Sequence, residues 1–184
     1  MAKQMYTLRD IPKYETIRAH ATRYPDIDPA SSAACVLLLR VASDILAAIE
    51  DYLASHKFSQ GRWTVMMILY RNPEQPLNPC DLAERSGVTR ATMTGLLDGL
   101  EREGLLARDT VPADRRMLQV RLTEKGMRSL EAVMPGYFRL IRSLMDGLPE
   151  EEKQSMIALL TKLGATAISK SVESPCGPPT KAAS

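Results

Sequence analysis

The sequence predicts a mainly α-helical fold with one small β-hairpin, and three observations support it. Apolar residues recur at helical spacing in two long segments, 30–57 and 123–145, on either side of the middle of the chain. Two shorter helical patterns lie between them, joined by a three-residue turn that contains Gly87. Two strand-like runs with alternating apolar residues follow at 105–123. A helix, a tight turn, a second helix and a hairpin in this order define a winged helix-turn-helix, here flanked by long helices.

Composition and charge narrow the classes of partner. Aromatic residues make up only 5% of the 184 residues, which disfavours proteins that bind single-stranded nucleic acid by stacking. The formal charge of +2 does not by itself indicate a nucleic-acid partner. Segment 85–128, however, holds nine Lys or Arg and six Asp or Glu, a net charge of +3. The basic excess therefore coincides with the predicted winged helix-turn-helix.

The remaining composition favours a cytoplasmic protein. No uninterrupted apolar run approaches the roughly 18 residues of a membrane span, and residues 1–20 lack the apolar core of a signal peptide. The three cysteines, Cys35, Cys80 and Cys176, form neither a disulfide framework nor a metal-binding pair. We therefore expect no membrane partner, no metal and no cofactor.

The two ends of the chain differ from the middle. Residues 1–28 form an N-terminal extension with a short helical pattern at Ile11, Tyr14 and Ile17, while the Pro- and Ser-rich tail 171–184 is predicted to be disordered. Before the tail, a last helix should begin at Pro149. Its predicted apolar face comprises Met156, Leu159, Leu160 and Leu163. The helix over 123–145 contains Pro135 and is expected to bend there.

Capping residues mark the boundaries of the central helices. Ser59 precedes a helical segment that reads as buried and stops before Asn72-Pro73. Asn78 and Pro79 suit the start of a short helix that Gly87 should end. Thr89 then caps the next helix, which Gly104 should close.

The second of these central helices begins with small polar and cationic side chains, which suit entry into the major groove of double-stranded DNA. The candidate groove residues are Thr89, Arg90, Ala91, Thr92 and Thr94. The hairpin tip carries Asp114, Arg115 and Arg116, of which a turn requires only the aspartate. An arginine there can reach a phosphate or a narrow minor groove, with Asp114 orienting one guanidinium.

These motifs resemble one known family. The segment "LAERSGVTRATMTGLLDGLEREGLLARDTVPADRRMLQVRLTEKG" is similar to the DNA-binding core of the MarR family of winged-helix repressors. The resemblance implies a homodimer whose helical regions, 29–57 and 123–170, interlock, with residues 58–122 binding a pseudo-palindromic DNA operator. It also implies Arg116 as the wing arginine with Asp114 as its partner. Gly95 and Gly99 depart from the family pattern, because relatives often carry Arg or Lys there.

The resemblance further implies release of DNA by a small aromatic or phenolic anion bound between the dimerisation and DNA-binding regions. The candidate ligand-binding residues are Arg40, His56, Arg62, Trp63, Met66 and Met67. A simpler interpretation makes Trp63 a core residue, Arg62 half of an inter-helix ion pair and His56 a surface residue near a helix end.

Two other functions remain open at this point. Cys35 lies about where an oxidant-sensing branch of the family keeps its reactive thiol, although its apolar neighbours favour a buried, inert one; Cys80 faces the positive end of a helix dipole. The protein is alternatively a winged-helix module for protein–protein contact. No nucleophile motif, phosphate-binding loop or Cys/His ligand spacing supports an enzyme.

Overall fold

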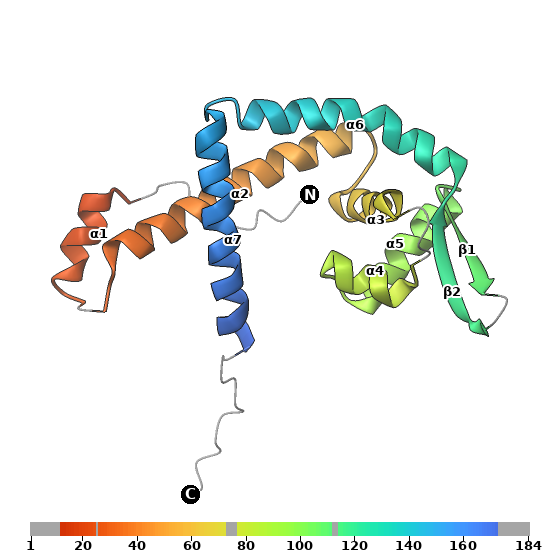
Figure 1. The fold of residues 1–184 in the computed structure, drawn as a ribbon, viewed down its shortest axis with the longest axis horizontal. Coiled ribbons are helices and arrows are strands. Elements are labelled where there is room, and N and C mark those ends of the chain that lie inside the picture. Colours follow the sequence, from red (N-terminus) through yellow and green to blue (C-terminus); the bar gives the residue numbers. More distant parts are fainter. Residues whose placement is uncertain (1–11, 25, 73–76, 112–113, 173–184) are drawn as a thin grey trace, which may run out of the picture. The chain divides into compact units, whose positions relative to one another are not determined.

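The computed structural model describes residues 12–24, 26–72, 77–111 and 114–172, and it confirms the mainly α-helical fold with a small β wing (Figure 1). The chain divides into two compact units, residues 1–140 and 141–184. The elements, in order, are α1 Tyr14–Ala21, α2 Pro29–Ser55, α3 Gln60–Arg71, α4 Pro79–Ser86, α5 Arg90–Arg102, β1 Leu106–Val111, β2 Asp114–Leu122, α6 Glu124–Leu144 and α7 Glu150–Val172.

The core of the first unit is built around α3. This helix contacts α2, α4, α5 and β2, so it is apolar on several sides rather than along one stripe. Its buried residues are Trp63, Val65, Met66, Met67 and Leu69. The prediction of a buried helix after Ser59 is therefore confirmed.

The predicted caps form as expected. Ser59 Oγ accepts a hydrogen bond from the backbone N–H of Arg62 at 3.3 Å and thereby satisfies one of the free amides at the start of α3. At α2 the cap is Asp28, which accepts from the backbone N–H of Ala30 at 3.1 Å. Pro29 is the first residue of α2. A proline fits there because the first helical amide needs no intrahelical acceptor.

Helix α2 bears on the expectation that no uninterrupted apolar run approaches the length of a membrane span. By length and composition alone it is long and apolar enough to cross a membrane. The apolar run is not uninterrupted, because Arg40 and Asp44 divide it. These two residues form an ion pair of 2.8 Å on the helix surface. Little of the apolar surface is covered within the chain: Leu37 is 49% and Val41 52% exposed.

The wing is a two-stranded antiparallel sheet with a register in which Leu106 lies opposite Leu122 and Arg108 opposite Val120. Val120 is 1% exposed and its N–H donates to Leu77 O at 2.9 Å, which joins the base of the wing to the segment before α4. Leu118 is 40% exposed. The alternating apolar residues of this strand are therefore buried at Val120 but exposed at Leu118, where the hairpin has passed beyond the core.

The chain ends agree with the predictions only in part. Helix α1 contacts α2 and buries Ile17, whereas Ile11 lies outside the described residues.

Helix α6, in which a bend was expected at Pro135, continues as one helix through that residue. In the second unit, α7 extends to Val172, two residues into the segment predicted as a disordered tail, and 173–184 lie outside the described residues. The predicted apolar face of α7 is exposed at Leu159, Leu160 and Leu163.

Candidate functional site

Capping residues define the ends of the two helices in the helix-turn-helix. Asn78 Oδ1 accepts from the N–H of Asp81 at 2.9 Å and begins α4. Gly87 ends α4 with a φ of 64°, in the left-handed region that disfavours a side chain. Thr89 Oγ1 then accepts from the N–H of Thr92 at 3.1 Å and begins α5. These bonds leave only residues 87–89 between the two helices, so their relative orientation is tightly limited.

Helix α5 has one buried face and one polar face. Met93, Leu97 and Leu100 are at most 1% exposed and hold the helix against the core. The residues predicted to enter a DNA groove are all exposed on the rest of the helix: Thr89, Arg90, Ala91, Thr92 and Thr94. Arg90 forms no ion pair with any described residue, so its guanidinium remains available to an anion outside the chain.

The hydroxyl groups near the start of α5 are ordered by local hydrogen bonds. Thr94 Oγ1 donates to Arg90 O at 3.0 Å, and the hydroxyls of Thr89 and Thr92 lie 2.9 Å apart. Each oxygen keeps acceptor capacity in this arrangement. The surface presented by α5 therefore combines one cation with small polar groups, which matches the requirements of phosphate and base-edge contacts.

The wing tip is described only in its backbone. Asp114, Arg115 and Arg116 begin β2, but their side chains lie outside the described residues, as do Pro112 and Ala113. Further along the hairpin, Arg121 Nε donates to Asp109 Oδ2 at 2.5 Å across the two strands. This pair makes one face of the wing polar and neutralises the Arg121 charge.

Arg108 connects the wing to α5, a role that the sequence reading missed. Its Nη2 donates to Asp98 Oδ1 at 2.6 Å, and its Nε lies 3.5 Å from Glu101 Oε2, an ion pair rather than a hydrogen bond. Asp98 and Glu101 are three residues apart on one helix face, which is the only local signal of such a site. The connection fixes the direction in which the wing leaves the helix.

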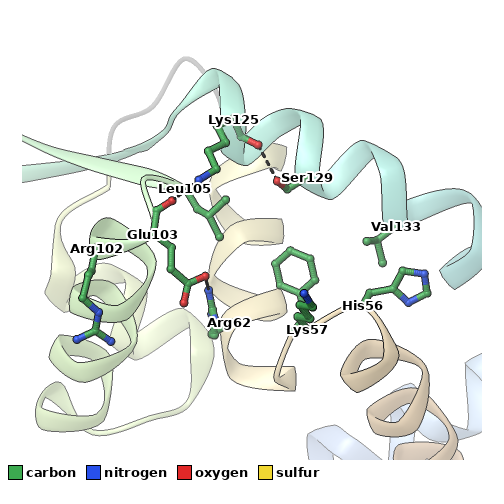
Figure 2. Close-up of a pocket in the computed structure, with 10 residues that line it drawn as sticks. His56, Lys57, Arg62, Arg102, Glu103, Leu105, Lys125, Ser129 and Val133 are labelled. Atoms are coloured by element: carbon green, nitrogen blue, oxygen red, sulfur yellow. Dashed lines mark hydrogen bonds and ion pairs between the residues drawn. The ribbon is translucent and has the colours of Figure 1, made fainter.

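A cleft of about 530 Å³ lies within the first unit, beside the C-terminal end of α5 (Figure 2). The end of α2, the start of α3, the end of α5 and the first half of α6 contribute its walls. The lining residues are His56, Lys57, Phe58, Arg62, Arg102, Glu103, Leu105, Lys125, Ser129 and Val133. Its volume falls within the range of small-molecule sites, roughly 300–1,000 Å³.

Of the six predicted ligand-binding residues, the structure places His56 and Arg62 in this cleft. Trp63, Met66 and Met67 belong to the buried core instead, because α3 is packed on several sides. Arg40 lies on α2 and pairs with Asp44. The simpler interpretation also fits this arrangement, since Trp63 is core, Arg62 pairs with Glu103 of another helix and His56 is exposed at a helix end.

Among the described residues that line the cleft, Glu103 is the only one with a carboxylate. Figure 2 shows it and Arg62 pointing toward each other between α5 and α3. The hydrogen bond from Arg62 lowers the pKa of Glu103 below its usual range, and the charges of Arg62, Arg102 and Lys125 lower it further, while burial opposes them. Glu103 is therefore ionised at neutral pH, within a lining that is otherwise cationic and apolar.

The backbone at Lys57 is unusual for a residue with a side chain. Lys57 has a φ of 62°, and Phe58 N–H closes the end of α2 by donating to Leu53 O at 2.9 Å. A left-handed conformation costs a non-glycine residue about 1 kcal/mol. Lys57 thus places a cation at the edge of the cleft, at a position where a glycine would make the fold more stable.

Both cysteines that fall within the described residues are exposed. The expectation that Cys35 is buried among its apolar neighbours is wrong for the single chain, in which the described residues leave its side chain exposed. Cys80 is exposed near the start of α4.

Comparisons with known proteins agree with this arrangement. The MarR family model matches residues 58–118, which cover α3 to the second strand of the wing. The HTH-type transcriptional repressor YetL of Bacillus subtilis is 36% identical over 156 residues, which cover 85% of this chain and 93% of the relative. The S. aureus MepR–DNA complex is similar in structure, with a TM-score of 0.66 and 25% identity over 72% of this chain and 96% of that one.

A third similar structure concerns a regulator with a ligand. It is Bordetella bronchiseptica BpsR, whose DNA binding is regulated by 6-hydroxynicotinic acid. Its TM-score is 0.61 with 26% identity, and the match covers 70% of this chain and 90% of that one.

Proposed function

The chain belongs to the MarR family of transcriptional regulators, and we propose that it acts as a homodimeric cytoplasmic repressor released from its operator by a small anion. The observation that carries the DNA-binding part is α5, whose apolar face is fixed in the core while its first turns expose hydroxyls and Arg90. A helix held in this way can enter the major groove without losing its packing.

Contacts with DNA divide between two elements in this proposal. The start of α5 supplies base-edge and phosphate contacts through Thr89, Arg90 and Thr92, with Ala91 and Thr94 beside them. The wing supplies Arg115 and Arg116 to phosphates or the minor groove, with Asp114 as the orienting carboxylate. Arg121 takes no part, because Asp109 already neutralises it.

The homodimer is supported by apolar side chains that are exposed in the part of the chain that the structure describes. On α2, Leu37, Leu38 and Val41 are exposed, and on α7 so are Ile157 and Leu159. Burial of apolar surface of this kind contributes about 25 cal/mol per Å². A second copy that covers both helices explains the apolar character of α2 without a membrane, and regions 29–57 and 123–170 form the dimer in this proposal.

The effector is proposed to occupy the cleft behind α5. The cationic side chains there attract an anion, and Phe58, Leu105 and Val133 offer an apolar surface to an aromatic or phenolic body. BpsR, with its 6-hydroxynicotinic acid, is a precedent for this ligand class in a similar structure.

Selection of bound fragments from a random duplex pool at fixed salt tests the DNA-binding part. We expect an enriched inverted repeat whose half-sites lie about one helical turn, roughly 34 Å, apart. Arg116→Ala should then weaken binding and reduce the salt slope by about one per subunit, whereas Arg121→Ala, the matched control in the same wing, should leave the slope unchanged. Absence of enrichment by a folded dimer would favour the protein-interaction module instead.

An oxidant-responsive form of the same function is the second candidate, and the exposure of Cys80 favours it. Cys35 is exposed in the single chain but lies on the α2 surface that the proposed dimer covers. Repeating the selection with and without reductant tests this candidate. Loss of operator binding under peroxide that Cys35→Ser or Cys80→Ser abolishes would support it. Loss that persists in both variants would exclude a sensor at either residue.

A further inference from the structure

We infer that Glu103 occupies the anion position of the cleft as an internal carboxylate, and that the carboxylate of an effector replaces it on Arg62. This inference rests on the proposed effector function and specifies how that site is regulated. The residues involved lie on two helices: Arg62 near the start of α3 and Glu103 at the end of α5, 41 positions apart in the sequence.

The two partners differ in how firmly they are held. The Arg62 side chain is 20% exposed, whereas the Glu103 side chain is 48% exposed. The guanidinium is therefore largely enclosed, and the carboxylate is the partner that can turn out into water. Arg62 Nε is buried and has no hydrogen-bond partner among the described residues, so the guanidinium retains a donor for another anion.

The charge of the cleft favours an additional anion. Lys57, Arg62, Arg102 and Lys125 line it with four positive charges, against the single negative charge of Glu103. An effector carboxylate that took the place of Glu103 would pair with the positive charge of Arg62. The carboxylate of Glu103 would then be hydrated by the solvent. The same cations that hold Glu103 ionised would also attract the incoming ligand.

The displaced residue is connected to the DNA-binding elements. Glu103 follows the last residue of α5, and its carbonyl accepts from Lys125 Nζ of α6 at 2.7 Å (Figure 2). The next two carbonyls, of Gly104 and Leu105, accept from the hydroxyl and the N–H of Thr123 at 2.7 and 3.1 Å. The end of α5 and the base of the wing are thus tied to the start of α6, and the Arg62 pair adds the tie to α3.

Displacement of Glu103 removes the ion pair with α3, and it leaves the packing of α5 on α3 and the hydrogen bonds to Thr123 and Lys125 in place. Helix α5 has thirteen residues and so is roughly 20 Å long. A small rotation at its C-terminal end is therefore carried to Thr89 and Arg90 at the DNA-facing end. The ligand class that fits is a monocarboxylate with an apolar body, because one guanidinium is contested and Phe58, Leu105 and Val133 give the cleft an apolar surface.

The test measures binding of a carboxylate panel to the full-length protein in the absence of DNA. The probes are benzoate, 4-hydroxybenzoate and 4-hydroxycinnamate, each with its uncharged amide, titrated calorimetrically. Glu103→Gln removes the competing charge and should bind at least one carboxylate about fivefold more tightly than the wild type, the size of one exposed ion pair. The amides should bind equally to both proteins.

Glu101→Gln is the matched control, since Glu101 lies two residues away on α5 and faces Arg108 instead of the cleft. It should bind the panel as the wild type does, and Arg62→Ala should lose carboxylate binding. Equal carboxylate affinities for Glu103→Gln and the wild type, or no binding by either, overturn the inference. Either result leaves the proposed operator binding untouched, because that is measured separately by the duplex selection.

Discussion

Replacement of Gly126 by alanine should destabilise the protein, although alanine normally stabilises a helix. Gly126 lies in the first turn of α6, and its N–H donates to Thr123 Oγ1 at 3.0 Å. A Cβ at this position would lie 1.9 Å from the carbonyl oxygen of Leu105 and 3.3 Å from a methyl group of Leu122. The first contact is with backbone, so it cannot be relieved by a rotamer change.

The magnitude follows from three effects. Relief of the contact must move the base of the wing away from α6, and overpacking of this kind costs about 1–3 kcal/mol. Loss of the Thr123 cap would add about 1 kcal/mol. The gain in helix propensity offsets up to about 1 kcal/mol. We expect a net loss of about 2 kcal/mol, equivalent to a decrease in Tm of about 4–8 °C for a chain of this size.

The assay is thermal and urea unfolding at one fixed protein concentration, because the stability of a dimer depends on concentration. Gly95→Ala is the control: it makes the same change inside a helix, where a new Cβ meets nothing within 4 Å. That variant should be as stable as the wild type or more stable by up to about 1 kcal/mol. If Gly126→Ala behaved like Gly95→Ala, the close approach of α6 to the base of the wing would be refuted.

The remaining predictions concern the core, the cleft and the wing. Leu97→Ala should reduce the free energy of unfolding by about 2–5 kcal/mol in urea melts, because Leu97 is 1% exposed on the buried face of α5. Lys57→Gly should raise it by about 1 kcal/mol in the same melts, by relieving a φ of 62°; an unchanged midpoint would argue against strain there. Arg108→Ala should weaken operator binding about fivefold, or 1 kcal/mol, in a fluorescence titration while leaving the helical circular dichroism signal intact. The hydrogen bond from Arg62 lowers the pKa of Glu103 in the folded protein. The stabilisation of the fold by this ion pair should therefore be fully present above the ordinary glutamate pKa of about 4.3. It should be lost as the pH falls through the lower pKa of the folded state. Acid titration of the wild type against Glu103→Gln should therefore show a stability difference at neutral pH that disappears in acid.

The features predicted correctly from the sequence depend on neighbours along the chain. Asn78, Gly87 and Thr89 act on amides or φ angles within three residues, so a short segment contains all the necessary information. The exposure of the α5 groove residues follows from the same local periodicity, once Met93 and Leu97 are assigned to the core.

The features that were missed, or that were predicted without their partner, depend on residues far apart in the sequence. Arg62 meets Glu103 across 41 positions and Arg108 meets Asp98 across 10, from elements whose packing no local pattern specifies. Helical periodicity placed Trp63 on an apolar face but did not distinguish a core from a cleft wall. The sequence therefore located the parts of the cleft lining that hold His56 and Arg62, and missed the parts that α5 and α6 contribute.

The exposed apolar surfaces also explain why Cys35 was misjudged. Burial was inferred from apolar neighbours along α2, and that inference assumes that apolar surface is covered within the same chain. Here Leu37 is 49% exposed in the single chain, so the neighbours of Cys35 indicate a surface that a second copy covers in the proposed dimer. If that dimer forms, the accessibility of Cys35 to a thiol reagent should decrease with increasing protein concentration. The accessibility of Cys80, which lies in the DNA-binding region at the start of α4, should remain constant. A decrease for Cys35 but not for Cys80 in one titration would therefore show that the partner subunit covers Cys35.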